Sequence, residues 1–260
     1  MRALLVGDVV GSVGLRALLD VLPRLRREHE PNVVVVNAEN AASGAGTSAR
    51  QARDLLDAGV DVLTGGNHSF RQADLYPVLD ADPRVLRPAN ISDRAPGRGT
   101  TVVDVRGGFR VAVVNLMGAV FLDVAHAPFA VVDDLVDRAR RETPFVLVDF
   151  HAEATSEKTA MGWHLDGRVT ALVGTHTHVQ TADDRVLPGG TAYITDLGMT
   201  GPHASVIGVR KEIALRRFLT GLPGRFDPAS GDVRVQGAVV EAGPDGRATA
   251  ITRIDIPVSA

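Results

Sequence analysis

The sequence of 260 residues predicts an α/β fold in which a largely parallel β-sheet packs against a second sheet containing antiparallel strands. The first observation is that short apolar runs alternate with segments of helical periodicity, as in βαβ units. The second is that two further runs, 100–105 and 109–116, flank Gly107-Gly108, which is typical of a hairpin. No linker interrupts the chain, so residues 1–260 are expected to form one domain.

Three strand and helix repeats form the N-terminal part of the prediction. The predicted strands comprise residues 3–6, 33–36 and 60–64. The second, Val33 to Val36, is entirely β-branched, as expected for a parallel strand that is buried on both faces. Leucines at helical spacing between positions 15 and 25 predict a first helix capped by Ser12, and a second helix is predicted from about Ser48 to Ala58.

The remainder of the chain is predicted to complete both sheets. Further strands are predicted at 145–148, 169–173, 191–195, 233–240 and 248–256. Helices are predicted from about Val131 to Arg141 and, with Ser156 as the cap, towards Trp163. The segment from Phe218 onward is interpreted as the approach to a closing antiparallel hairpin.

Composition excludes several classes of protein. Hydrophobic residues make up 45% of the chain and charged residues 23%, as in ordinary soluble globular proteins. The net charge of -3 argues against a broad basic face for duplex DNA. Without cysteine there is neither a disulfide nor a thiolate zinc site. The N-terminal apolar run is too short for a signal peptide and no run could span a membrane, so a cytoplasmic protein without a membrane partner is expected.

The segment Gly174-Thr175-His176-Thr177-His178 is the strongest chemical signal in the sequence. It follows a predicted strand and places two imidazoles at i and i+2, at the carboxyl edge of a sheet where open α/β folds bind their ligands. Histidine is the commonest metal ligand, so the pattern indicates a metal site. A surface loop that happens to contain two histidines is the alternative interpretation.

Other predicted strands also end in oxygen or nitrogen ligands. The residues at these ends are Asp8, Glu39, Asn40, Asn67, His68, His151, His176 and His178. If the ends converge, they supply more ligands than one ion needs, and two ions sharing a bridging carboxylate fit better. Glu39 is the predicted bridge because it lies between the two groups of strand ends. Each residue also has an ordinary structural alternative; Asp8 could cap the next helix, for example, and His151 could be a hydrogen-bonded core histidine.

The motifs resemble those of a known enzyme family. Gly66-Asn67-His68 and the His176/His178 segment are similar to the GNH and GHxH blocks of the calcineurin-like metallophosphoesterases. The segments 7–11, 37–40, 149–158 and 174–183 resemble, more closely, the YmdB-like bacterial cyclic-nucleotide phosphodiesterases. This resemblance runs nearly from end to end. The chain differs from the wider superfamily at Val10, which occupies the position of a histidine in the usual Asp-x-His motif.

The resemblance implies a metallophosphoesterase-type sandwich of two mixed β-sheets flanked by helices, with metal ions at the carboxyl ends of the strands. It implies two divalent or mixed-valence ions, either Fe or Mn, with Zn as a further candidate. The implied ligands of the first ion are Asp8, Glu39, Asn40 and His178. The implied ligands of the second ion are Glu39, Asn67, His151 and His176.

The implied activity is hydrolysis of 2',3'-cyclic nucleotides, or of related phosphodiesters such as RNA ends, to the 3'-nucleotide. A hydroxide bridging the two ions would attack phosphorus in line. His68 would act as the general acid or would stabilise charge in the transition state. A phosphomonoesterase or protein phosphatase using the same site is one alternative, and a regulatory protein that senses a metal or a nucleotide is another.

Several further residues have less specific signals. Glu153, and to a lesser degree Asp149, is expected to orient His151 through a hydrogen bond. His203 is a candidate substrate contact because it lies in a Gly/Pro loop. Ala119 stands where related proteins carry arginine, which would change affinity or substrate choice if that arginine contacts phosphate. A homo-oligomer is compatible with such a fold, although no residue identifies an interface.

Overall fold

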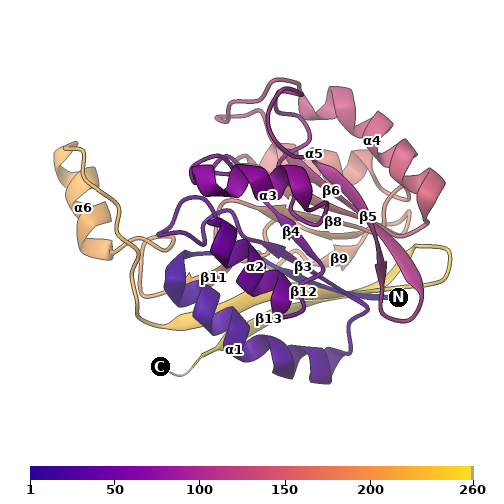
Figure 1. Ribbon diagram of the computed structural model, residues 1–260, viewed down its shortest axis with the longest axis horizontal. Coiled ribbons are helices and arrows are strands. Elements are labelled where there is room, and N and C mark those ends of the chain that lie inside the picture. The colour runs from indigo at the N-terminus through magenta and orange to yellow at the C-terminus, as the bar shows by residue number, and fades with distance from the viewer. Residues whose placement is uncertain (259–260) are drawn as a thin grey trace.

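The computed structural model describes residues 1–258 as two β-sheets packed face to face, with helices outside them (Figure 1). The first sheet has the order β2-β11-β12-β1-β3-β4, and β13 pairs with β12. Its strands are β1 (Arg2–Val6), β2 (Asp8–Val9), β3 (Val33–Asn37), β4 (Val62–Thr64), β11 (Met199–Pro202), β12 (Val233–Ala242) and β13 (Ala248–Pro257). The sheet is mixed because β1 pairs in parallel with β3 and antiparallel with β12.

The second sheet has the order β5-β6-β7-β8-β10-β9. Its strands are β5 (Thr100–Val105), β6 (Phe109–Met117), β7 (Val146–His151), β8 (Ala171–Thr175), β9 (Arg185–Val186) and β10 (Ala192–Ile194). Strands β6, β7, β8 and β10 are parallel, whereas β5 and β9 add antiparallel edges. This arrangement confirms the predicted α/β fold with two mixed sheets.

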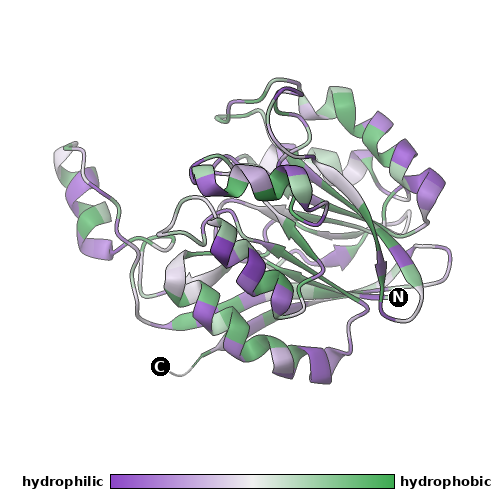
Figure 2. Ribbon diagram, in the orientation of Figure 1, coloured by the Kyte–Doolittle hydropathy of each residue, from purple (hydrophilic) through white to green (hydrophobic). Residues whose placement is uncertain are grey.

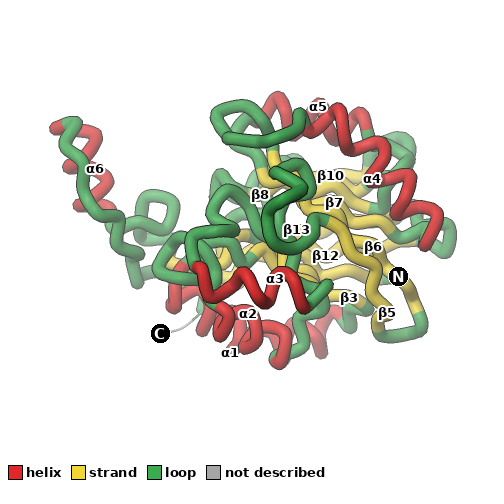
Figure 3. The backbone as a smooth tube through the Cα atoms, turned by 45° about the horizontal axis from the view of Figure 1, so that its top comes forward, coloured by secondary structure: helices red, strands yellow, loops and turns green. Residues whose placement is uncertain are grey.

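Helices cover the outer face of each sheet (Figures 1 and 3). The first sheet carries α1 (Gly11–His29), α2 (Ala49–Asp57), η1 (Ala73–Leu75) and α3 (Tyr76–Ala81). The second carries α4 (Pro128–Glu142) and α5 (Thr155–His164). The last helix, α6 (Lys211–Thr220), projects away from the sandwich. No helix within residues 1–258 is sufficiently long and apolar to cross a membrane.

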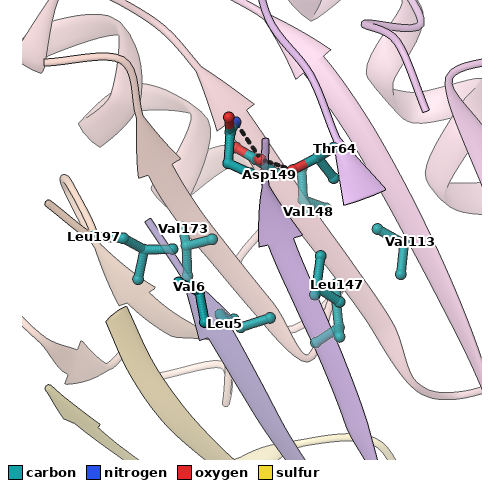
Figure 4. A pocket seen from close by; sticks show the side chains of 11 residues that line it. Leu5, Val6, Thr64, Val113, Leu147, Val148, Asp149, Val173 and Leu197 are labelled. Carbon is teal, nitrogen blue, oxygen red and sulfur yellow. Dashed lines mark hydrogen bonds between the residues drawn. The ribbon is translucent and has the colours of Figure 1, made fainter. Parts of the chain in front are cut away.

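The faces between the two sheets form a continuous apolar core. Figure 2 shows hydrophobic strands at the centre of the fold and helices that alternate between hydrophobic and hydrophilic faces. Leu5 and Val35 of the first sheet pack in the same cluster as Val113, Leu147 and Val173 of the second. Figure 4 shows this interlayer core beneath a hydrogen-bonded carboxylate, Asp149, so the apolar layer ends where the polar strand ends begin.

The structure contradicts both predicted helix caps, Ser12 and Ser156, and shows a cap at Ser48 that was not predicted. Ser48 caps α2, since its hydroxyl accepts a hydrogen bond from Gln51 N at 3.2 Å. Ser12 lies inside α1, because Val10 bridges to Asn40 and stays extended until the helix begins at Gly11. Ser156 likewise lies in the first turn of α5, because the extended residue that precedes that helix is Ala154.

Some elements were not predicted. Helix α6 occupies residues 211–220, so the interpretation of the segment from Phe218 as the approach to a hairpin is wrong for its first three residues. The short strands β2, β9 and β11 were also missed, and α3 with its preceding turn was not expected. Strands of two to four residues are defined by their pairing partners, which local periodicity does not contain.

Candidate metal centre

The predicted strand ends of both sheets converge at one edge of the sandwich. Asp8 follows β1, Glu39 and Asn40 follow β3, Asn67 and His68 follow β4, His151 ends β7, and His176 and His178 follow β8. The carboxylates of Asp8 and Glu39 and the imidazole of His151 are completely buried. The structure therefore brings these side chains together in a site that is largely shielded from water.

One group of donor atoms surrounds the imidazole of His151. Its Nε2 lies 3.0 Å from Asn67 Oδ1, 3.0 Å from His176 Nδ1 and 3.4 Å from Glu39 Oε1. Ligand atoms of Glu39, His151 and His176 all lie within 4.8 Å of one another, as needed to hold one ion. Two imidazole nitrogens, a carboxylate and an amide oxygen therefore face a common point.

A second group of donor atoms lies beside the first. His178 Nε2 is 3.7 Å from Asp8 Oδ1 and 3.1 Å from the side-chain amide of Asn40. That amide is in turn 2.9 Å from Glu39 Oε1. The Glu39 carboxylate thus contacts both groups, which is the position that a bridging ligand requires.

The charge distribution fits bound cations. Asp8 Oδ1 is buried and has no hydrogen-bond partner, which is costly for a carboxylate oxygen unless a cation or donor meets it. Burial acts to lower the pKa of His178, yet the nearby carboxylate of Asp8 raises that pKa to about 9. Burial and the neighbouring His151 lower the pKa of His176 to about 4, so its ring is neutral and able to coordinate. Carboxylate, imidazole and amide donors suit divalent first-row metals.

The second ring nitrogen of each histidine is already engaged. Glu153 Oε2 lies 3.0 Å from His176 Nε2, which leaves His176 Nδ1 for the centre. The carbonyl of Ile207 accepts a hydrogen bond from His178 Nδ1 at 2.9 Å, which leaves its Nε2. Such outer hydrogen bonds fix the tautomer and the direction of a ligating imidazole. Glu153 therefore contacts a histidine as expected, but that histidine is His176 and not His151.

His151 is oriented through a buried chain of hydrogen bonds. Its Nδ1 lies 3.0 Å from the hydroxyl of Thr175, which donates to Asp149 Oδ1 at 2.7 Å. Asp149 also accepts hydrogen bonds from Thr64 and from Asn37, the latter at 3.0 Å. Burial raises the pKa of Asp149 to about 6, although these hydrogen bonds oppose the rise. Sequence reasoning missed Thr175, whose only signal was its position next to His176.

The loop carrying His176 and His178 has an unusual backbone. Both residues have positive φ, 95° and 64°, which is uncommon outside glycine. Thr177 between them donates through its amide to Asp196 Oδ2 at 3.1 Å, and Lys158 Nζ contacts the same oxygen at 2.8 Å. Lys158 and Asp196 are both buried, so an internal ion pair anchors the loop. Neither residue was predicted to support the site.

Gly66 lets the β4 loop approach the centre. A Cβ at this position would lie 2.3 Å from His151 Nε2 and 2.4 Å from Glu39 Oε2, distances that no side chain could accept. The glycine that precedes Asn67 and His68 is therefore required by the close packing of the donor atoms.

His68 lies at the border between the centre and solvent. Its Nδ1 is 2.8 Å from Asn40 Oδ1 and 3.2 Å from Glu39 Oε1, and its backbone amide donates to Glu39 Oε2 at 3.0 Å. The side chain is 26% exposed. It lines a cavity of about 570 Å³ into which Glu39, Asn40, His176 and His178 also face. A molecule in this cavity would contact both His68 and the donor atoms.

Three further residues, among them the predicted substrate contact His203, do not line this cavity. His203 Nδ1 contacts the carbonyl of Gly201 at 3.1 Å, and its role as a substrate contact stays a prediction. Trp163 lies on α5 and is 53% exposed. Ala119 donates its amide to Glu157 at 2.8 Å in the loop after β6.

The family model described as YmdB-like protein matches residues 4–254 of this chain. The chain belongs to the YmdB-like family. Membership confirms the resemblance found in the sequence motifs, and the match covers every residue of the candidate metal centre.

Named relatives of this YmdB-like protein are phosphodiesterases or phosphatases, as expected for an enzyme. The 2',3'-cyclic-nucleotide 2'-phosphodiesterase of Bacillus subtilis is 45% identical, over 93% of this chain and 91% of that protein. A crystal structure of a hypothetical protein from Thermus thermophilus has 42% identity and a TM-score of 0.92, covering 99% of both chains. A structure described as a novel phosphatase from Mycoplasma pneumoniae has 34% identity and a TM-score of 0.90, covering 99% of this chain and 93% of the other.

Proposed function

We propose that this protein is a dimetal phosphodiesterase that hydrolyses 2',3'-cyclic nucleotides to 3'-nucleotides. The observation that carries the proposal is the convergence of donor atoms around Glu39 at one end of a cavity that His68 also lines. The name of the Bacillus subtilis relative supports the substrate class.

The two groups of donors correspond to two ions. Asp8, Glu39, Asn40 and His178 would hold one ion, and Glu39, Asn67, His151 and His176 would hold the other. When bound, two such ions activate water and neutralise charge on the phosphodiester. Iron or manganese suits this nitrogen and oxygen donor set, and zinc remains compatible with it.

The surroundings of Asn40 suggest how His68 holds its proton. For Asn40 to bind an ion through oxygen, its amide must turn over, and its NH₂ group then faces His68 Nδ1. That ring nitrogen would accept a hydrogen bond, so His68 would carry its proton on Nε2. The proton is then available to an oxygen of a substrate in the cavity.

A 2',3'-cyclic phosphate fits a site with one such acid. Water adds its hydroxyl to phosphorus and releases its other proton to solvent as the bond to O2' breaks, and O2' needs one proton from an acid to leave as a hydroxyl. The acid then regains a proton from solvent. His68 Nε2 is proposed to supply that proton, or to stabilise charge on a phosphoryl oxygen. The phosphate remains on O3', which gives the 3'-nucleotide.

Two alternatives use the same residues. A phosphomonoesterase is the second candidate because the Mycoplasma pneumoniae structure is described as a phosphatase. The ratio of kcat/KM for 2',3'-cAMP and 3'-AMP decides between them. A regulatory protein that senses metal or nucleotide would bind both and turn over neither.

The deciding experiment measures metal content together with product identity. Protein purified without added metal, and the same protein after reconstitution, is subjected to elemental analysis and then incubated with 2',3'-cAMP. We expect about two equivalents of Fe or Mn per chain and 3'-AMP as the product. One equivalent or none after reconstitution, or a fully loaded protein that cleaves no diester, contradicts the proposal.

A further inference from the structure

The cavity at the metal centre has two chemically different sides. One side consists of the polar groups of Glu39, Asn40, His68, His176 and His178. The rest of the lining is mainly apolar and includes Val206, Ile207, Val209, Phe218, Phe226 and Pro228. The cavity volume of about 570 Å³ lies within the range of small-molecule sites. A ligand that fills it would need an anionic or polar end and an apolar end.

Aromatic rings dominate the apolar side. Phe218 on α6 is 82% exposed and Phe226 beyond that helix is 43% exposed, although both line the cavity. The guanidinium of Arg217 lies over the Phe226 ring, 5.0 Å from its centroid. An exposed aromatic ring with a cation on it is a surface on which planar groups stack.

The proposed substrate has two parts that match these two sides. The phosphodiester must lie at the donor atoms, so the base is the part of a nucleotide left to occupy the aromatic side. We propose that Phe226, with Arg217 and Phe218, forms a stacking site for the nucleobase of the substrate. The inference rests on the proposed function, since it takes the nucleotide to be bound with its phosphate at the centre.

The chemistry of this side also predicts what it does not recognise. Among the residues that line the cavity, the only carboxylate and side-chain amide are Glu39 and Asn40, which belong to the centre. Outside the centre, the polar side chains of the lining are those of Ser43 and Arg217, and the Arg217 guanidinium is engaged over the Phe226 ring. Stacking without pairing to the hydrogen-bonding edge of a base tolerates all four bases, since each has a π-face. We therefore expect 2',3'-cAMP and 2',3'-cUMP to be hydrolysed with similar kcat.

The test compares a nucleotide with the same cyclic phosphate lacking its base. Phe226→Ala is expected to raise KM for 2',3'-cAMP by about 5- to 100-fold, as loss of one stacking ring does. Its KM for ribose 2,3-cyclic phosphate should equal that of the unaltered protein. An unchanged KM for 2',3'-cAMP, or an equal rise for both substrates, overturns the stacking site.

Controls separate this inference from the proposed function. Leu219→Ala is the matched variant, because Leu219 is 83% exposed on α6 and does not line the cavity, and its KM values should not change. Binding of 3'-AMP, measured by calorimetry, provides a readout without turnover. If the metal-loaded protein cleaves neither diester but Phe226→Ala weakens 3'-AMP binding, the proposed function fails and the stacking site stands. If Phe226→Ala cleaves each diester with the same KM as the unaltered protein, the stacking site fails and the function stands.

Discussion

The two sides of the cavity differ in how firmly the fold holds them. At the candidate metal centre, the side chains of Asp8, Glu39 and His151 are fully buried and linked to both sheets by hydrogen bonds. By contrast, Phe218, which lines the cavity, projects from a helix that lies apart from the sandwich, and it exposes more than four fifths of its surface.

This difference follows from what each side has to do. Metal ligands must be held to a fraction of an ångström, which requires buried side chains whose own rotamers are fixed. Stacking on an aromatic ring tolerates small displacements and needs only accessible surface. Substitutions should therefore change activity, metal affinity or stability strongly near the centre and only weakly on α6.

His68 joins the two sides and should show the largest effect. His68→Ala is expected to lower kcat for 2',3'-cAMP by about 10²- to 10⁴-fold while metal content is unchanged, because His68 is a proposed acid and not a proposed ligand. The loss should be much smaller with bis(p-nitrophenyl) phosphate, whose nitrophenolate leaves without a proton. Equal losses on both substrates would instead favour charge stabilisation, and loss of metal would contradict both roles.

Breaking the ion pair between Lys158 and Asp196 should have the next largest effect, which is a loss in the free energy of unfolding. Lys158→Met leaves a buried carboxylate without its partner, which typically costs about 3–5 kcal/mol in the free energy of unfolding. Urea denaturation measures this loss. Arg168→Met is the control, because its pair with Asp133 is solvent-exposed and is expected to contribute at most about 1 kcal/mol. Similar losses in the two variants would show that the buried pair does not anchor the loop.

The hydroxyl of Thr175 should have a smaller and more specific effect. Thr175→Val keeps the shape of the side chain but removes the link between His151 and Asp149, so metal affinity should fall by about 10- to 100-fold. Competition with a chelator measures that affinity. The control is Thr170→Val. Thr170 directly precedes β8, and its equally buried hydroxyl accepts a hydrogen bond from Val146 N, away from the centre, so this variant should leave metal affinity unchanged. Equal metal affinity in the two variants would refute the orienting role.

Leu219 on α6 should show the smallest effect of all. Leu219→Ser removes an exposed side chain that contributes no surface to the cavity, so the free energy of unfolding should change by less than about 0.5 kcal/mol. A thermal melt measures it. A larger loss would mean that this surface is covered by another chain in solution, and analytical ultracentrifugation would then detect an oligomer.

Sequence reasoning located the centre because each donor directly follows an apolar strand. Asp8, Glu39 and His151 stand at or just after the end of an apolar strand, and parallel strands bring such positions to one edge. The supporting groups could not be found in the same way. Thr175 and Asp196 act through contacts that only the folded chain creates. Thr175 and His151, for example, are 24 residues apart in the sequence.

Helix α6 was not predicted because its sequence carries only a weak helical pattern. Leu215, Phe218 and Leu219 lie at helical spacing, but they pack on no core, so the amphipathic pattern that marks a buried helix face is weak. The misplaced cap at Ser12 shows a related limit, since the pairing of Val10 with Asn40, and not local capping, sets where α1 begins.

The distribution of the donors along the chain also has a kinetic consequence. Asp8 accepts a hydrogen bond from the amide of His176, 168 residues later, and β1 pairs with β12 near the C-terminal end. Contacts so distant in sequence form slowly, because loop closure precedes any gain from them. During synthesis, Asp8 and Glu39 are therefore made well before the histidines that complete their site. The complete set of donor side chains can assemble only after most of the chain has emerged from the ribosome.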